Sequence, residues 1–128
     1  MKSLTTLLDG KVRIQVLEGA LQVHMGRSAQ DMGELDAVRT RTEQMLAEHA
    51  LAHVLFDVSK ADRSPPEVRD AIWQWLSTSQ IFQAVAFVVE SEMLAVTINM
   101  KGVQTGVTMR AFADPDAARS WLTLKMGR

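Results

Sequence analysis

Two short, almost continuous apolar runs constrain the fold of this chain more than any other feature. Residues 52–58 read AHVLFDV and residues 84–89 read AVAFVV. Runs of this length and composition are typical of central strands that are covered on both faces of a sheet. Strands of that kind occur in mostly parallel sheets, where a helix connects each strand to the next. The two runs therefore predict an α/β fold.

The sequence on either side of these runs predicts further strands. Residues 12–17 and 21–25 alternate apolar and polar side chains on either side of Gly19, which predicts a β-hairpin with one buried face. The residues expected on the buried face of the first hairpin strand are Val12, Ile14 and Val16. Residues 107–112 predict a last strand.

The first two helices are predicted between these strands. Residues Ser28 to Asp31 fit a capping box at the start of the first helix. Its apolar stripe is expected to contain Leu35, Val38, Met45, Leu46 and His49. Residues 65–79 predict a second helix, which follows the strand over residues 52–58.

Two more helices are predicted near the C-terminus. Ser91 can cap a third helix over residues 92–101, with Gly102 as its C-terminal stop. Asp114 as N-cap and Pro115 as first helical residue predict a fourth helix. The whole order predicts a single mixed, mostly parallel β-sheet with an N-terminal hairpin and about four helices, in one domain over residues 1–128.

Charge and composition argue against several classes of partner. The chain has 14 basic and 15 acidic residues, without the basic cluster that nucleic acid requires. It has no cysteine, so disulfides and thiol catalysis are excluded. No apolar run reaches the ~18 residues of a membrane span, and the N-terminus lacks the pattern of a signal peptide. We expect no nucleic acid partner, no membrane span and a cytoplasmic protein.

The sequence shows no pattern of catalytic or metal-binding residues. The three histidines, His24, His49 and His53, do not have the spacing of metal ligands. A P-loop, a dinucleotide-binding glycine motif and a G-x-S-x-G nucleophile elbow are all missing from the sequence. We therefore expect no enzyme activity, no cofactor and no metal.

Two stretches, together with the order of elements, resemble a known family. These are VTMRAFADPDAARSWL at residues 107–122 and VLFDVS at residues 54–59. They resemble the STAS fold of anti-sigma-factor antagonists and, more closely, the SpoIIAA-like family of small bacterial proteins. The resemblance implies a non-enzymatic protein–protein interaction domain in bacterial regulation, which can include partner switching. Related folds also include members that bind apolar ligands, so the alternative is binding of a lipid or other apolar small molecule.

The resemblance also points to a candidate switch loop, SKADRSPPEVR at residues 59–69. In the antagonists, a serine near the start of the corresponding helix accepts phosphate and controls which partner binds. The implied phosphoacceptor or switch residues here are Ser64, Ser59 and Asp57, although Arg63 stands where the antagonists usually have an aspartate. The residues themselves offer a structural alternative, because Ser64 to Glu67 fits a capping box. Asp57 and Ser59 are then expected only to brace the turn.

Two groups of residues are candidates for a partner surface. On a helical wheel the predicted core face of the second helix contains Val68, Ala71, Ile72 and Trp75, so that Trp73 points outward beside Arg69. The third helix has little polar surface, so we expect it to be buried by a second subunit or by an apolar ligand. A homodimer is the simpler of these two explanations. The candidate surface residues are Trp73, Arg69, Met93, Val96 and Met100.

The two possible functions predict different structures. A protein interaction domain should have an exposed apolar patch near Trp73 or on the third helix. A binder of apolar ligands should instead enclose an internal apolar cavity of a few hundred Å³.

Overall fold

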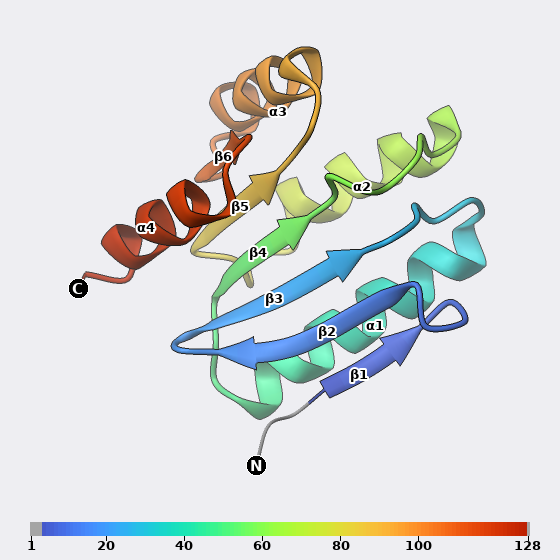
Figure 1. The fold of residues 1–128 in the computed structure, drawn as a ribbon, viewed down its shortest axis with the longest axis horizontal. Coiled ribbons are helices and arrows are strands. Elements are labelled where there is room, and N and C mark those ends of the chain that lie inside the picture. The colour runs from blue at the N-terminus through green and yellow to red at the C-terminus, as the bar shows by residue number, and fades with distance from the viewer. Residues whose placement is uncertain (1–3, 128) are drawn as a thin grey trace.

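A computed structural model describes residues 4–127, which build one six-stranded sheet with four helices (Figure 1). The strands are β1 (Leu4–Leu7), β2 (Val12–Leu17), β3 (Ala20–Met25), β4 (His53–Asp57), β5 (Ala84–Val88) and β6 (Met109–Phe112). They lie side by side in chain order. The pairs β1–β2 and β2–β3 are antiparallel, and the pairs from β3 to β6 are parallel. The predicted α/β class and mostly parallel sheet are therefore confirmed.

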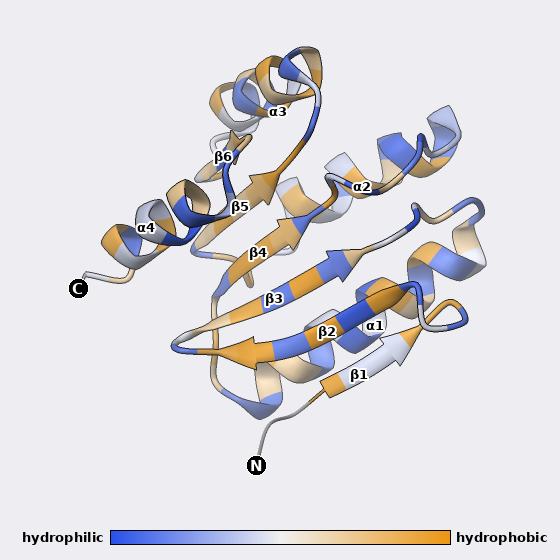
Figure 2. Cartoon of the chain, in the orientation of Figure 1, coloured by the Kyte–Doolittle hydropathy of each residue, from blue (hydrophilic) through white to orange (hydrophobic). Residues whose placement is uncertain are grey.

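The helices are divided unequally between the two faces of the sheet. They are α1 (Met32–Glu48), α2 (Pro66–Thr78), α3 (Glu92–Thr105) and α4 (Pro115–Lys125). Buried residues of α1, α2 and α3 belong to the same core cluster, which includes one face of the sheet. Helix α4 packs on the opposite face, against β4, β5 and β6. The hydropathy colouring in Figure 2 shows β4 and β5, which have helices on both faces, as mostly hydrophobic.

Aromatic side chains connect the sheet to α2 in the main core. The ring of Phe56 on β4 stacks on Phe87 of β5, with centroids 5.5 Å apart. Trp75 of α2 meets the edge of Phe56 at 6.1 Å, and its Nε1 donates a hydrogen bond of 2.8 Å to Oε2 of Glu43 on α1. The indole N–H is therefore satisfied although the side chain is buried, as buried tryptophans require.

The first strand was not predicted from the sequence. Strand β1 has the sequence LTTL, and its residues are half-buried or exposed at the edge of the sheet. It returns to β2 through a turn in which Leu8, Asp9 and Gly10 all have positive φ. Short edge strands with half-exposed residues lack the apolar alternation that marks a strand in a sequence, which explains the omission.

The predicted end of the third helix is wrong. Gly102 lies inside α3, and the helix continues to Thr105 and ends at Gly106, where φ is 75°. A Cβ atom at Gly102 would lie 3.1 Å from the backbone oxygen of Met109 and 3.2 Å from its Cγ. Gly102 therefore allows the close contact between α3 and β6 and does not stop the helix.

Replacement of Gly102 by alanine tests this contact. Overpacking at Gly102→Ala should cost about 1–3 kcal/mol, and the higher helix propensity of alanine should return about 1 kcal/mol. Because the added Cβ atom meets backbone as well as side chain, the net free energy of unfolding should fall by about 2 kcal/mol. Urea unfolding measures the difference.

Gly33 at the start of α1 provides the matched control. A Cβ atom there would approach a single side-chain oxygen, Oδ1 of Asp31, at 3.3 Å and would meet no backbone atom. Gly33→Ala should therefore leave stability unchanged or slightly raised. Equal or higher stability of Gly102→Ala would contradict the close packing of α3 on β6.

Candidate functional site

The predicted switch residues lie where β4 ends and α2 begins. Asp57 is the last residue of β4, and its Oδ1 accepts hydrogen bonds from the N–H of Ser59 at 3.1 Å and from its Oγ at 2.6 Å. The other oxygen, Oδ2, lies 3.5 Å from Nδ1 of His24 on the neighbouring strand β3. Asp57 therefore braces the turn after β4, and the hydroxyl of Ser59 is engaged in the same bracing.

The predicted capping role of Ser64 is wrong. Helix α2 begins at Pro66, its N-cap residue is Pro65, and no side chain caps it. Pro65 precedes another proline and therefore adopts an extended conformation, with ψ of 153°. This moves the helix start one residue beyond the position that a Ser64 cap would need. Ser64 is half-buried, and no hydrogen bond of its hydroxyl is found among the described residues.

A second loop holds the switch loop in place. The backbone N–H of Ser28 donates to Oδ1 of Asp62 at 3.0 Å, and the Ser28 hydroxyl donates to the Asp62 backbone oxygen. The side chain of Gln30 donates to the backbone oxygen of Arg63 at 3.3 Å. The prediction that Ser28 begins the capping box of α1 is therefore wrong, since Asp31 is the N-cap and accepts from the Glu34 N–H at 2.8 Å.

The second loop is itself fixed by an ion pair between Arg27 and Glu34. Glu34 also accepts a hydrogen bond of 2.9 Å from the N–H of Gln30. The hydrogen bond from Arg27, and then the one from Gln30, lower the pKa of the Glu34 carboxyl below its ordinary value. The same bond to Glu34 raises the pKa of Arg27. Both side chains are partly exposed, so the pair acts mainly as a local brace.

The outward orientation predicted for Trp73 is only partly correct. Trp73 is half-buried and packs against the main core cluster, while the fully buried residues of α2 are Val68, Trp75 and Leu76. On the helical wheel Trp73 lies about 60° beyond Leu76, so its large ring reaches back to the core boundary. Ala71 and Ile72, which were predicted for the core face, are half-buried and pack against buried residues that include Val68. Arg69 is half-buried too, and its Nε has no hydrogen-bond partner among the described residues.

The third helix carries the largest exposed apolar side chains of the predicted site. The exposed fractions are 79% for Met93, 57% for Val96, 55% for Met100 and 85% for Val103. On a helical wheel these four residues occupy an arc of about 80°, centred about 180° from Ile98. Ile98 and Gly102 are the buried residues of α3. The residues Met93, Val96, Met100 and Val103 are called the α3 stripe below.

Within one chain, helix α3 is therefore buried on one side only, and its burial by a second subunit or an apolar ligand stays a prediction. Helix α3 packs against β6 at the edge of the sheet, and the α3 stripe faces away from that contact. Val103 was missed because the helix was expected to end at residue 101. The repeat of apolar residues at spacings of three, four and three was nevertheless visible in the sequence.

A polar side chain next to the α3 stripe protects the edge of the sheet. Oδ1 of Asn99 accepts a hydrogen bond of 3.0 Å from the backbone N–H of Ala111 on β6. Because β6 is an edge strand, this N–H has no neighbouring strand to pair with. Asn99 therefore fixes the rotation of α3 and satisfies an edge amide at the same time.

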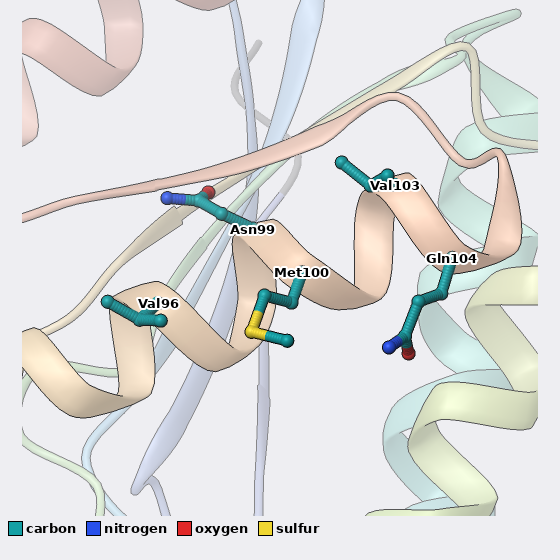
Figure 3. Close-up of a pocket in the computed structure, with 5 residues that line it drawn as sticks. All are labelled: Val96, Asn99, Met100, Val103 and Gln104. Atoms are coloured by element: carbon teal, nitrogen blue, oxygen red, sulfur yellow. The ribbon is translucent and has the colours of Figure 1, made fainter.

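A shallow depression of about 460 Å³ lies on the same helix (Figure 3). Its lining residues all come from α3, and they are Val96, Asn99, Met100, Val103 and Gln104. A second depression of about 230 Å³ lies between the end of α2 and residues 105–108 and includes polar residues such as Gln80, Gln83 and Thr108. Neither is the internal apolar cavity expected of a lipid binder.

The predicted site residues therefore lie on different surfaces. Asp57, Ser59 and Ser64 lie in and beside one loop, Arg69 and Trp73 lie on α2, and Met93, Val96 and Met100 lie on α3. Within residues 4–127, no three His, Asp or Glu side chains are grouped in a way that could hold a metal ion. Over the same residues, no helix has the length and apolar character to cross a membrane.

Comparison with known proteins assigns the family. A model of the SpoIIAA-like family matches residues 19–123, so the chain belongs to the SpoIIAA-like family. This fold is of the STAS type, whose domains are generally regulatory and typically not enzymes. The predicted resemblance is confirmed.

A solved structure supports the same fold. It is an uncharacterized protein of the DUF3478 family with a SpoIIAA-like fold from Shewanella loihica PV-4. The alignment covers 95% of each chain with 16% sequence identity and a TM-score of 0.68, so the similarity shows the fold alone. No curated protein matches the chain.

The ion pair between Arg27 and Glu34 predicts a dependence of stability on pH. Because folding lowers the pKa of Glu34, the pair stabilises the fold above the ordinary glutamate pKa of about 4.3, and this stabilisation is lost as the pH falls. Glu34→Gln should therefore unfold at lower urea concentration than the unchanged chain at neutral pH. The difference should shrink in acid.

Glu48→Gln provides the control for this experiment. Glu48 lies 3.6 Å from Arg41 and is more exposed than Glu34, so its replacement should have little effect at either pH. If the difference in unfolding urea concentration between Glu34→Gln and the unchanged chain stays constant from neutral to acidic pH, the charge of the Glu34 carboxylate does not contribute to stability.

Proposed function

We propose that this protein is a non-enzymatic protein–protein interaction domain in bacterial regulation, and that the α3 stripe is its docking surface. The observation that carries the proposal is the exposure of four large apolar side chains along one side of α3, from 55% to 85%. Exposed apolar area costs free energy in water, roughly 25 cal/mol for each Å². Contiguous apolar patches on soluble proteins commonly mark contact sites, and methionines adapt to varied partners.

The shape of the surface favours a protein over a small molecule. The depression on α3 is lined by one helix, so it is a hollow on a convex ridge and does not surround a ligand. Small-molecule sites are concave and bury roughly 70–90% of a ligand. An exposed helix with an apolar side fits the groove or helix of another protein. Nothing in the two depressions favours the alternative of a lipid or other apolar ligand.

The family also suggests that phosphorylation controls the partner, and the local geometry favours Ser64 as the acceptor. The N-terminus of α2 has no side-chain cap, so a phosphate beside it would lie at the positive end of the helix dipole. Pro65 and Pro66 carry no backbone N–H, and the N–H groups of Val68 and Arg69 already donate to the backbone oxygen of Pro65, so the attraction would come mainly from the dipole and from nearby arginines. Arg63 directly precedes Ser64, Arg69 follows it on the second turn of α2, and both could pair with the phosphate. Glu67, in the first turn, opposes it.

Ser59 is a poorer acceptor because of its neighbour. Its hydroxyl donates to the Asp57 carboxylate at 2.6 Å, so a phosphate there would be held against a negative charge. We therefore propose Ser64 as the switch residue, with Asp57 and Ser59 as the structural support of its loop.

The docking proposal predicts that a charge in the α3 stripe removes a partner. The chain, tagged and purified gently from its own cells, should bring down a specific protein. Val96→Glu should lose that protein at least tenfold, because a carboxylate in the centre of an apolar contact must give up its water. Quantitative mass spectrometry of the purified material measures the loss.

Leu124→Glu is the matched control. Leu124 is 70% exposed but belongs to α4, which packs on the opposite face of the sheet from α3. The Leu124→Glu variant should retain the partner, and circular dichroism should show that Leu124→Glu and Val96→Glu are both folded. Equal capture by Val96→Glu and Leu124→Glu would contradict docking at α3, as would the absence of any specific partner.

The switch proposal predicts where phosphate is found. Peptide mapping of the chain from its own cells should place phosphate on Ser64, and Ser64→Ala should abolish it. Ser59→Ala is the control and should leave the modification in place. Phosphate on Ser59, or none under any growth condition, would show that the switch proposal is wrong.

A further inference from the structure

We propose that the α3 stripe binds the same stripe of a second copy of this chain, with the two helices antiparallel. The inference rests on the proposed docking function of α3 and names its partner. The stripe residues Met93, Val96, Met100 and Val103 follow one another at spacings of three, four and three. These are the spacings of the two apolar positions of a coiled-coil heptad, which pack a helix against another helix.

The stripe is complementary to itself when two copies lie antiparallel. A two-fold axis opposite Ile98 places Met93 against Val103 of the second copy, and Val96 against Met100 of the second copy. Both pairs then repeat in reverse, as a two-fold symmetric interface requires. Each layer combines one long, flexible methionine with one smaller valine, so all four layers have similar volume.

The charges near α3 agree with this arrangement. The residues that flank the stripe along its length are Thr97, Asn99 and Gln104, which are exposed and uncharged. The acidic residues Glu90 and Glu92 lie at its N-terminal end. A helix of 14 residues is about 21 Å long, so an antiparallel pair keeps the two acidic ends that far apart, whereas a parallel pair brings them together.

The uncharged flanks also favour a second copy over an unrelated helix. In coiled coils, charged residues beside the apolar positions select the partner and its orientation. Of the residues beside the stripe on α3 only Glu92 is charged, and it lies at the N-terminal end, so the flanks of an antiparallel identical helix do not repel it. An unrelated partner would have to be chosen without charge complementarity.

The size of the surface predicts a weak dimer. A helix about 21 Å long and roughly 10 Å across presents only about 200 Å² in projection. A standard interface buries about 800 Å² on each partner. The dimer should therefore form reversibly and only at the higher protein concentrations.

Sedimentation velocity of the full chain over a hundredfold range of concentration tests the proposal. The mass should rise from 14.2 kDa towards twice that value for the unchanged chain and for the control Leu124→Glu. Val96→Glu and Met100→Lys should each remain at the mass of one chain. Neither should unfold, because both side chains are more than half exposed.

The double variant Val96→Glu with Met100→Lys tests the orientation. In the antiparallel pair each new glutamate faces a new lysine of the second copy, so dimerisation should return. In a parallel pair glutamate would face glutamate and lysine would face lysine. The variant Val96→Glu with Met100→Glu should not dimerise in either orientation.

Three results would overturn the proposal. The first is that the unchanged chain keeps the mass of one chain at all concentrations, and the second is that the dimer survives Val96→Glu. The third is that the variant Val96→Glu with Met100→Lys stays monomeric while the unchanged chain dimerises. If the unchanged chain never dimerises but Val96→Glu fails to bring down a protein that the unchanged chain captures from cells, only the dimer proposal is overturned. If Val96→Glu changes neither dimerisation nor the capture of another protein, the dimer proposal and the docking proposal are both overturned.

Discussion

The contact between α3 and the edge strand β6 determines which surface this protein presents. Because β6 is the last strand of the sheet, α3 can bury only one side of itself, at Ile98 and Gly102. The missing side chain of Gly102 lets the two backbones approach, and the hydrogen bond from Ala111 to Asn99 fixes the rotation of the helix. The apolar residues on the other side of α3 are consequently held outward. The exposed α3 stripe is thus a direct result of how the helix is anchored.

The switch loop is built in the opposite way, from polar contacts. The Ser28–Asp62 and Gln30–Arg63 hydrogen bonds join the loops after β3 and β4. Asp57 braces the start of the switch loop through Ser59. These bonds lie at the carboxyl ends of parallel strands, where α/β folds commonly place their functional residues. A phosphate on Ser64 would therefore be added to a loop that these hydrogen bonds already hold in place.

The sequence predicted the fold because the buried parallel strands leave an unambiguous pattern. The runs that became β4 and β5 have almost no polar residues, since helices cover both faces. Strand β1 could not be predicted, because half-exposed residues at a sheet edge carry no such pattern. The bond between Ser28 and Asp62 could not be predicted either, since those residues are 34 positions apart and no local rule connects them.

Two errors at the candidate site arose from local rules that the surrounding structure overrides. Ser64 satisfies the sequence rule for a helix cap, but the consecutive prolines move the helix start to Pro66. Gly102 satisfies the rule for a helix stop, but its role is the contact with Met109. The second error left Val103, the most exposed residue of the α3 stripe, out of the predicted surface, although its spacing from the other stripe residues was readable in the sequence.

The central claim is that the outer side of α3 contacts a protein in the cell. The most direct measurement is photocrosslinking in living cells, with a photoreactive amino acid placed at Val103 in one strain and at Leu124 in another. Both positions are at least 70% exposed, so both can accept the probe. The account predicts a crosslinked protein, whether a second copy or another chain, from position 103 and not from position 124. No crosslink at position 103, or the same products from both positions, would contradict it.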